Sequence, residues 1–337
     1  MYKKAVITIS SKDELLDAIF IDGACAGNYW GLHFDTFHKA GFHAQLVTVL
    51  GTGDVMDGVE AFKTIHQIIR QNPDKLLKVT HIDDLNTAKR EGTLGVICHM
   101  QGAENLGSDI GNLNLFYDLG LRVLQLAYNR RNYWCEGCLE PDQSTGLSNL
   151  GRRLVSACNE TGIVIDGSHC STGSVLQVCE LSDKPVICSH SNAYAVHPSR
   201  RNITDEVIFA LADTNGVVGV CGFPPFVSSQ RPLTLHHFID HIDHIESLVG
   251  IDHISLGLDY FYRDFEEMHI KRMIDIGLWD EETYVTSLPW VWPSGLDDIS
   301  RIIPCLTSAL TDAGYSSSEI RKIFGLNLMR VFSEVWK

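Results

Sequence analysis

Eight short apolar runs mark the chain, and each is followed by a longer segment with the residue spacing of a helix. Continuous apolar runs rich in Val, Ile and Leu are typical of parallel strands that helices bury on both faces. Eight strand–helix units in succession predict an α/β fold, the (β/α)8 TIM barrel. The runs cover residues 18–24, 44–50, 95–102, 122–129, 162–169, 185–191, 216–223 and 253–260.

This pattern extends over most of the 337 residues, so we expect residues 1–337 to form a single barrel domain. Helices are predicted before the fourth and fifth runs, and they end at Gly120 and Gly162 because glycine suits a helix C-cap. Residues 261–296 show little periodicity and predict a loop excursion after the eighth strand. A last helical pair is expected to close the chain.

The charge of the chain narrows the range of partners. Its 42 acidic and 27 basic residues give a net charge of −15, which repels nucleic-acid phosphates and anionic lipids. No apolar run approaches the ~18 residues of a membrane span, and the N-terminus lacks the apolar core of a signal peptide. We expect a cytoplasmic protein that binds a small molecule and neither nucleic acid nor membrane. Self-association into a homo-oligomer is an alternative that the sequence leaves open.

Active sites of such barrels lie at the carboxyl ends of the strands. His169 and His190 end successive runs, so adjacent strands would present two imidazoles to one divalent metal ion. Asp259 ends the eighth run and is a candidate general acid or base; its alternative roles are helix capping or pairing with Arg263. Other polar residues at the ends of runs are Asp22, Cys25, His99, Gln101, Tyr128, Asn129 and Asp166.

Five segments together resemble the renal (membrane) dipeptidase family of metallo-barrels, from about residue 95 to the end. They are LGLRVLQLAYNRRN, GLSNLGRRLV, GIVIDGSHCS, KPVICSHSNAYAVHPSRRNITDE and HISLGLDY. The resemblance implies an amidohydrolase-like barrel with two zinc ions at its mouth and the hydrolysis of dipeptides. It also implies that His169 and His190 are metal ligands, that Arg201 holds the substrate carboxylate, and that Asp259 is the acid or base.

Three positions depart from the family pattern. The segment expected to carry a His-x-Asp ligand pair reads Ala24-Cys25-Ala26, and Gln101 stands where a metal-bridging glutamate is expected. Tyr128 replaces a histidine that polarises the substrate. The chain thus resembles a divergent bacterial branch that lacks the first metal site. We expect one divalent ion, zinc, on His169 and His190.

Further roles follow from these departures. Gln101 is the expected extra metal ligand, and His99, two residues earlier on the same strand face, is the alternative. Tyr128 and Asn129 are candidates for substrate binding beside Arg201, and Tyr128 is also a catalytic candidate with Asp259.

The leading prediction is a dipeptidase-like metal-dependent hydrolase that acts on a dipeptide or another small amino-acid-derived substrate with a carboxylate. One alternative is a single-metal lyase, isomerase or decarboxylase, because a single Lewis acid can stabilise a carbanion or enolate. The other alternative is a catalytically silent member of the family.

Other motifs receive weaker interpretations. His33 and Asp35 form a His-x-Asp that could replace the lost ligands. His237, His241 and His244 share one helix face, which we expect on the outer ring, away from any metal. Cys135 and Cys138 form a CxxC without the second pair of a structural zinc site.

Overall fold

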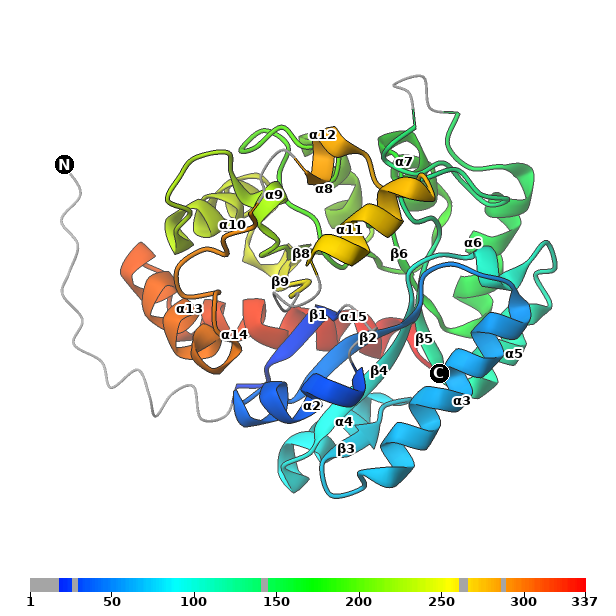
Figure 1. Cartoon of the computed structure of the whole chain (residues 1–337), viewed down its shortest axis with the longest axis horizontal. Coiled ribbons are helices and arrows are strands. Elements are labelled where there is room, and N and C mark those ends of the chain that lie inside the picture. Colours follow the sequence, from blue (N-terminus) through cyan, green and yellow to red (C-terminus); the bar gives the residue numbers. More distant parts are fainter. Residues whose placement is uncertain (1–17, 26–29, 141–144, 261–265, 286–288) are drawn as a thin grey trace.

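The computed structural model describes residues 18–25, 30–140, 145–260, 266–285 and 289–337, with backbone alone for 30–33 and 266–269. Its barrel strands follow one hydrogen-bonded order, β1-β2-β4-β5-β6-β7-β8-β9, and every neighbouring pair is parallel (Figure 1). The eight-stranded barrel predicted from the apolar runs is confirmed, since each run overlaps one strand. The strands are β1 (Ile21–Cys25), β2 (Ala44–Leu50), β4 (Leu94–Met100), β5 (Leu121–Gln125), β6 (Val164–Asp166), β7 (Val186–Cys188), β8 (Val217–Val220) and β9 (Ile254–Leu256).

The first and last strands of this order meet through contacts at their carboxyl ends. The Leu258 N–H donates to Asp22 Oδ1 at 2.8 Å, and the Asp259 N–H donates to the Ala24 carbonyl at 3.2 Å. A Cβ atom on Gly23 would lie 2.5 Å from the Leu256 carbonyl oxygen, so only glycine permits this close approach. These contacts bring Asp22 and Asp259 to the same part of the barrel mouth.

Helices lie around the outside of the barrel between successive strands (Figure 1). The predicted ends of two of them are confirmed, because Gly120 and Gly162 cap α5 and α6 in the left-handed conformation. A short extra strand, β3 (Leu76–Lys78), pairs with β4 and was not predicted, since three residues carry too little pattern. The outer helices are α2 (Trp30–Lys39), α3 (Val55–Gln71), α4 (Ile82–Glu91), α5 (Asn112–Leu119), α6 (Asn149–Thr161), α7 (Thr172–Leu181), α8 (Asp205–Asp213) and α10 (Leu235–Val249), with short turns α9 (Pro224–Val227), η2 (Glu104–Leu106) and η3 (Ile251–His253).

One end of the barrel is closed by the C-terminal helix α15 (Asn327–Val335). Its residues Leu328, Val331 and Phe332 pack with apolar residues from the early part of the strands, such as Ile21 and Val164. Before α15 the chain forms α13 (Ile299–Ala313), α14 (Ser317–Arg321) and the π-helical turn η5 (Lys322–Leu326). Because α15 closes this end with apolar side chains, the polar candidate site residues lie at the opposite end, where the strands have their carboxyl ends.

The segment 261–296, for which the sequence predicts a loop, contains two helices in its described part. They are α11 (Glu266–Asp275) and α12 (Glu281–Tyr284). The sequence of α11, EEMHIKRMID, has helical apolar spacing only at Ile270, Met273 and Ile274, a short stripe, and α12 is a single turn. Residues 261–265 and 286–288, including Arg263, lie outside the described residues.

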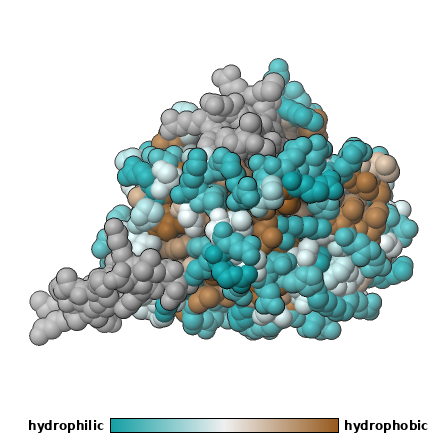
Figure 2. Space-filling model, turned by 90° about the horizontal axis from the view of Figure 1, so that it is seen from below, coloured by the Kyte–Doolittle hydropathy of each residue, from teal (hydrophilic) through white to brown (hydrophobic). Residues whose placement is uncertain are grey.

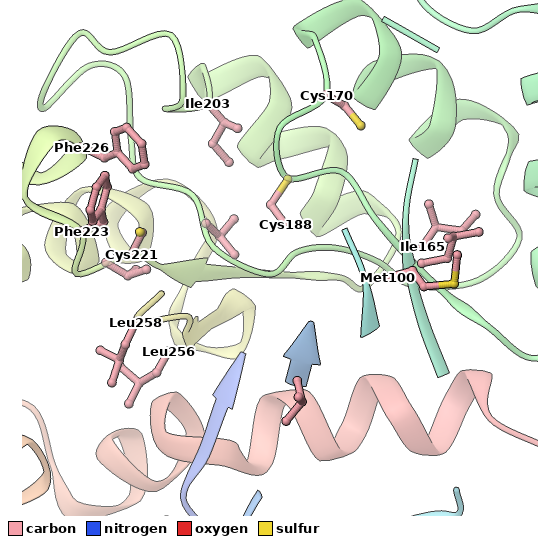
Figure 3. Packing of buried hydrophobic residues seen from close by; sticks show 14 of the residues in the cluster. Met100, Ile165, Cys170, Cys188, Ile203, Cys221, Phe223, Phe226, Leu256 and Leu258 are labelled. Atoms are coloured by element: carbon pink, nitrogen blue, oxygen red, sulfur yellow. The ribbon is translucent and has the colours of Figure 1, made fainter. Parts of the chain in front are cut away.

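The described surface is mainly hydrophilic on the face in Figure 2, with apolar side chains in small groups. No helix within the described ranges is both long and apolar enough to cross a membrane. Figure 3 shows the core above α15, where Phe223 and Phe226 follow β8 and lie near Leu256 and Leu258 of the neighbouring β9 segment. This aromatic and aliphatic packing supports one side of the barrel mouth.

Candidate active site

Two histidines that follow neighbouring strands meet at the barrel mouth. His169 follows β6 and His190 follows β7, and their Nε2 atoms lie 2.8 Å apart. Both side chains are buried, at 4% and 0% exposure. The sequence predicts this convergence from the positions of the two residues at the ends of successive strands.

Backbone strain is concentrated at the same mouth. Four non-glycine residues have a positive φ in the described chain, and three of them are Asn129 (61°), His169 (63°) and Asp259 (49°). The left-handed region costs free energy for a residue with a Cβ and is most common at functional sites. The fold therefore tolerates strain where three candidate site residues lie.

The contacts of Asn129 determine which nitrogen of His169 carries the proton. Asn129 Nδ2 donates to the Leu278 carbonyl at 2.9 Å, which fixes the orientation of the amide. Asn129 Oδ1 therefore faces His169 Nδ1 at 2.7 Å and can only accept a hydrogen bond. His169 Nδ1 must carry the hydrogen, so Nε2 of the neutral ring presents a bare lone pair.

A second chain of contacts determines the proton of His190. Ser189 Oγ donates to Asp166 Oδ2 at 2.5 Å and lies 2.7 Å from His190 Nδ1. Although burial acts to raise it, contact with His99 and His190 and a hydrogen bond from Ser189 hold the pKa of Asp166 well below its usual range. The carboxylate is thus ionised and takes the serine hydrogen, so His190 Nδ1 must donate to Ser189 Oγ. His190 Nε2 is also bare.

Two bare nitrogens 2.8 Å apart repel each other unless a positive charge lies beside them. Burial and the nearby Arg201 guanidinium hold the pKa of both imidazoles well below its ordinary value, so neither ring is protonated near neutral pH. Neutral imidazole is the form that binds metal, and a hydrogen bond at Nδ1 is the usual way that proteins orient such a ligand. The pair therefore fits one divalent cation.

The described residues around this pair do not add a charged ligand to the two neutral imidazoles. Among the residues that the structure describes, no group of three His, Cys, Asp or Glu side chains could hold a metal ion. His99 Nε2 lies 3.1 Å from Asp166 Oδ2, the carboxylate that also accepts from Ser189, the partner of His190. Gln101 is buried, and its amide nitrogen has no partner in the described part of the chain. Ala24 is buried at the end of β1, and Ala26 lies outside the described residues.

Arg201 and the two carboxyls at the β1–β9 junction dominate the electrostatics of the mouth. Arg201 is 2% exposed, and its Nη2 donates to the His190 carbonyl at 3.2 Å. Burial raises the pKa of Asp259 to about 6, against the opposing charge of Arg201. Burial likewise raises the pKa of Asp22 to about 7, although the N–H groups of Leu258 and Ala24 favour its ionised form. Both carboxyls can exchange protons near neutral pH.

Tyr128 covers the outer face of the histidine pair. Its ring stacks on His169 with centroids 4.2 Å apart, and its hydroxyl accepts a hydrogen bond from Trp279 Nε1 at 3.0 Å. Trp279 in turn stacks on Tyr284, whose hydroxyl accepts from Asn129 Nδ2 at 2.8 Å. Sequence reasoning missed Trp279 and Tyr284 because they lie in the segment predicted to be a loop. The density of aromatic residues there, from LWDEETY to LPWVW, is the signal that could have found them.

Asn129, a predicted substrate-binding residue, is fully buried and engaged within the protein. Its amide contacts His169, Leu278 and Tyr284, and its oxygen also accepts from Cys138 Sγ at 3.3 Å. Cys135 Sγ lies 3.9 Å from Cys170 Sγ instead of facing Cys138, so the CxxC thiols have different partners. Asn129 thus holds His169, and its amide is engaged by protein groups in this structure.

The remaining histidine motifs lie away from the pair. Asp35 on α2 forms an ion pair with Lys75 at 2.9 Å, and the side chain of His33 lies outside the described residues. On α10, His241 Nε2 contacts the Val227 carbonyl at 2.9 Å, and His244 pairs with Asp205 at 2.8 Å. His237 contacts Thr234 at the start of the same helix. Asp35, His237, His241 and His244 therefore each contact another residue of the chain on the outer ring.

Comparisons with known proteins agree with the fold. A family model described as "Membrane dipeptidase (Peptidase family M19)" matches residues 20–277, further toward the N-terminus than the segments that carry the sequence resemblance. A curated relative, "Dipeptidase tcpJ" of Claviceps purpurea, is 26% identical over 324 residues, which are 94% of this chain and 68% of the relative.

Two solved structures share the fold. An amidohydrolase from Pseudomonas aeruginosa matches with a TM-score of 0.87 and 29% identity, over 97% of this chain and 99% of that one. A metallo peptidase from Rhodobacter sphaeroides, solved with a phosphinate mimic of the dipeptide L-Ala-D-Ala, matches with a TM-score of 0.79 and 23% identity, over 95% of this chain and 100% of that one.

Proposed function

The chain belongs to the membrane dipeptidase family, peptidase family M19, and is a dipeptidase-like hydrolase; we propose that it cleaves small dipeptides with the help of one divalent metal ion, zinc, at His169 and His190. The observation that supports the metal is the pair of bare Nε2 atoms 2.8 Å apart, each fixed by a hydrogen bond at Nδ1. A divalent ion at this pair supplies a Lewis acid that polarises a carbonyl or a water molecule.

One ion is proposed in place of two because the residues at the first metal site supply neither an imidazole nor a carboxylate. Ala24 has no ligand atom in its side chain, and Gln101 offers a neutral amide where a bridging carboxylate is expected. The unpartnered amide of Gln101 leaves its side chain available to reorient its oxygen toward the ion. His169, His190 and Gln101 would then hold the ion and leave it accessible to water or substrate.

Substrate binding is assigned to Arg201 and Tyr128. A guanidinium matches a carboxylate with two parallel hydrogen bonds, and the burial of Arg201 excludes water from that contact. The Tyr128 hydroxyl already accepts from Trp279, which leaves its own hydrogen to donate to a substrate oxygen. Burial and the Asp259 charge act to keep this phenol protonated, because the pKa of Tyr128 is raised well above its usual value.

Proton transfer is assigned to Asp259. With its pKa raised to about 6, this carboxylate is ionised at neutral pH yet is basic enough to accept a proton from attacking water. The same group then donates that proton to the leaving amine. The positive charge of Arg201 keeps the pKa from rising further, so acid and base forms are both accessible.

The proposal is tested by assaying purified protein against dipeptides that include L-Ala-D-Ala, with and without added Zn²⁺. We expect turnover that a chelator abolishes and that Zn²⁺ restores. His190→Gln should remove it, whereas His241→Gln, a matched buried histidine on α10, should not. Turnover that survives both chelation and His190→Gln would contradict the metal-dependent mechanism, and the absence of any dipeptide turnover by the loaded protein would contradict the substrate.

A further inference from the structure

A small cavity lies behind His169, on the side of α7 and α8. It has a volume of about 150 Å³, and its lining includes His169, Arg200 and Arg201. Tyr128, His190 and Asp259, the other proposed site residues, do not line it. Cys170 and Ile203, which also line it, belong to the segments that lead into α7 and α8 (Figure 3). The cavity therefore adjoins the active site through His169 and Arg201, and it shares Arg200 with a larger cavity.

The N-terminus of α7 contributes to this lining through Thr172, the first residue of the helix. The N-cap residue Ser171 accepts a hydrogen bond from Ser174 N, which leaves the N–H groups of Thr172 and Gly173 without a partner in the described part of the chain. Free N–H groups and the helix dipole make such an end favourable for an anion. A helix of ten residues carries the full terminal charge of its dipole.

Two buried donors on the cavity lining lack partners as well. Ser191 is 1% exposed and Arg201 is 2% exposed. Within the described ranges, neither Ser191 Oγ nor Arg201 Nε makes a hydrogen bond. Buried donors in native proteins are nearly always paired with protein, water or a ligand. The proposed dipeptide carboxylate accounts for the Arg201 donor, so the unpaired Ser191 hydroxyl is the donor that indicates an acceptor in the cavity.

The charges around the cavity favour a negative occupant. Arg200 donates to the carbonyls of Cys138 and Glu140, and neither it nor Arg201 has an acidic partner at ion-pair distance among the described residues. Glu140 also lines the cavity, and its Oε1 accepts from the Arg131 N–H. Two guanidinium charges thus outweigh one carboxylate here, in a chain whose net charge is −15.

From this convergence we propose that the cavity is a binding site for a small oxyanion such as inorganic phosphate, separate from the place of the dipeptide. Arg200, the Ser191 hydroxyl and the N-terminus of α7 supply donors for its oxygens, and Arg201, which holds the dipeptide carboxylate in the proposed function, contributes its positive charge. A volume of about 150 Å³ is the size that holds one benzene ring in engineered cavities, so a tetrahedral anion fits and a nucleotide does not. The site does not depend on the proposed catalytic reaction.

Calorimetric titration of the purified full-length chain with phosphate tests this site. We expect one saturable site per chain, which Arg200→Gln weakens by about tenfold or more through the loss of a charge-assisted hydrogen bond. Thr172→Pro should weaken it as well, since proline at the first helical position deletes an N–H but keeps the helix. The extended backbone of Ser171 (ψ 155°) accommodates a following proline.

Two matched variants serve as controls. Asn149→Pro makes the same change at the first position of α6, after the similarly extended Ser148 (ψ 168°). Arg231→Gln removes an arginine that lines a different cavity. Both should bind phosphate like the wild type, and all variants are compared by circular dichroism and thermal melting.

Several results would overturn the proposal. These are the absence of saturable binding at millimolar phosphate, equal weakening in the control variants, and loss of binding when a chelator removes metal, which would place the anion on the ion. Strict competition between phosphate and a dipeptide substrate would place the anion in the mouth of the barrel. Phosphate that binds without raising the apparent KM in proportion to its concentration supports the separate cavity.

Discussion

His169 and His190 point bare Nε2 atoms at each other across 2.8 Å, while Asn129 and Ser189 hold the protonated Nδ1 atom of each ring from behind. Neither ring can turn to donate without breaking a buried hydrogen bond. This arrangement leaves two lone pairs directed at one point, as the proposed metal site requires.

The first prediction concerns metal content. Zinc-loaded protein should contain about one ion per chain after dialysis. The chain offers one imidazole pair, and neither Ala24 nor Gln101 supplies a charged ligand for a second ion. His169→Gln should lose the ion, and His241→Gln should keep it, since His241 is tied to the Val227 carbonyl on the outer ring. Elemental analysis gives the count. Two ions per chain would contradict the single site and direct attention to His33 and Asp35.

Asn129 should control the metal affinity although it makes no contact with the ion. Asn129→Leu leaves His169 Nδ1–H without an acceptor and frees the ring to rotate, which should weaken zinc binding by about 10–100-fold. Asn129→Asp restores an acceptor and should recover most of that loss. Competition with a chromophoric chelator measures both values. Equal weakening by Leu and Asp would show that Asn129 acts on folding alone.

The pH dependence of kcat/KM should reflect the titration of Asp259. Because its pKa is raised to about 6, kcat/KM should fall about tenfold per pH unit below that value, as the carboxylate becomes protonated and can no longer accept a proton. Asp259→Asn should lower activity at all pH values and flatten this acidic limb. Steady-state assays between pH 5 and 8 with constant ionic strength provide the test. An acidic limb that persists in Asp259→Asn belongs to another group.

Asp22 should make the protein less stable as the pH rises. Burial raises its pKa from 3.8 to about 7, so the folded chain holds a proton between about pH 4 and 7 that the unfolded chain has released. The free energy of unfolding therefore decreases with rising pH in this window, by at most about 4 kcal/mol for a shift of this size.

Asp22→Asn keeps an acceptor for the Leu258 N–H and removes this titration. Thermal melting of the chelator-treated protein should show that the advantage of the variant grows from pH 4 to 8. Asp74→Asn, an exposed control, should show no such trend. A variant that melts in parallel with wild type over the whole range would refute the buried titration.

Substrate recognition should depend on the shape of the Arg201 side chain and not only on its charge. Arg201→Lys keeps a cation but loses the planar fork, so KM for a dipeptide with a free carboxylate should rise by about tenfold or more. The C-terminal amide of the same dipeptide lacks that carboxylate and should show no comparable change. Comparison of KM and kcat for the two substrates separates lost binding from general damage. Equal effects on both would make Arg201 structural.

Much of the barrel could be read from the sequence because its strands are buried on both faces. The run 44–50 coincides with β2, and the other seven runs each overlap one strand to within one residue at its end. The prediction failed where the pattern was short: β3 has three residues and is held by backbone pairing to β4, α12 is a single turn, and the apolar stripe of α11 is limited to Ile270, Met273 and Ile274. Pairing partners and packing, rather than local composition, form these elements.

The amino-acid sequence by itself determined that His169 and His190 would face one point, since residues that end adjacent parallel strands meet at the same edge. It also determined that Ala24 and Gln101 would leave one metal site without charged ligands. Only the tertiary structure decided which imidazole nitrogens carry no hydrogen and which carboxyl groups have a pKa raised toward neutral pH. Asn129 lies 40 residues from His169 and 155 from Tyr284, and Asp22 lies 236 residues from Leu258. Tautomers and pKa values depend on such long-range contacts and on the burial of each side chain, which chain folding creates and no local pattern encodes.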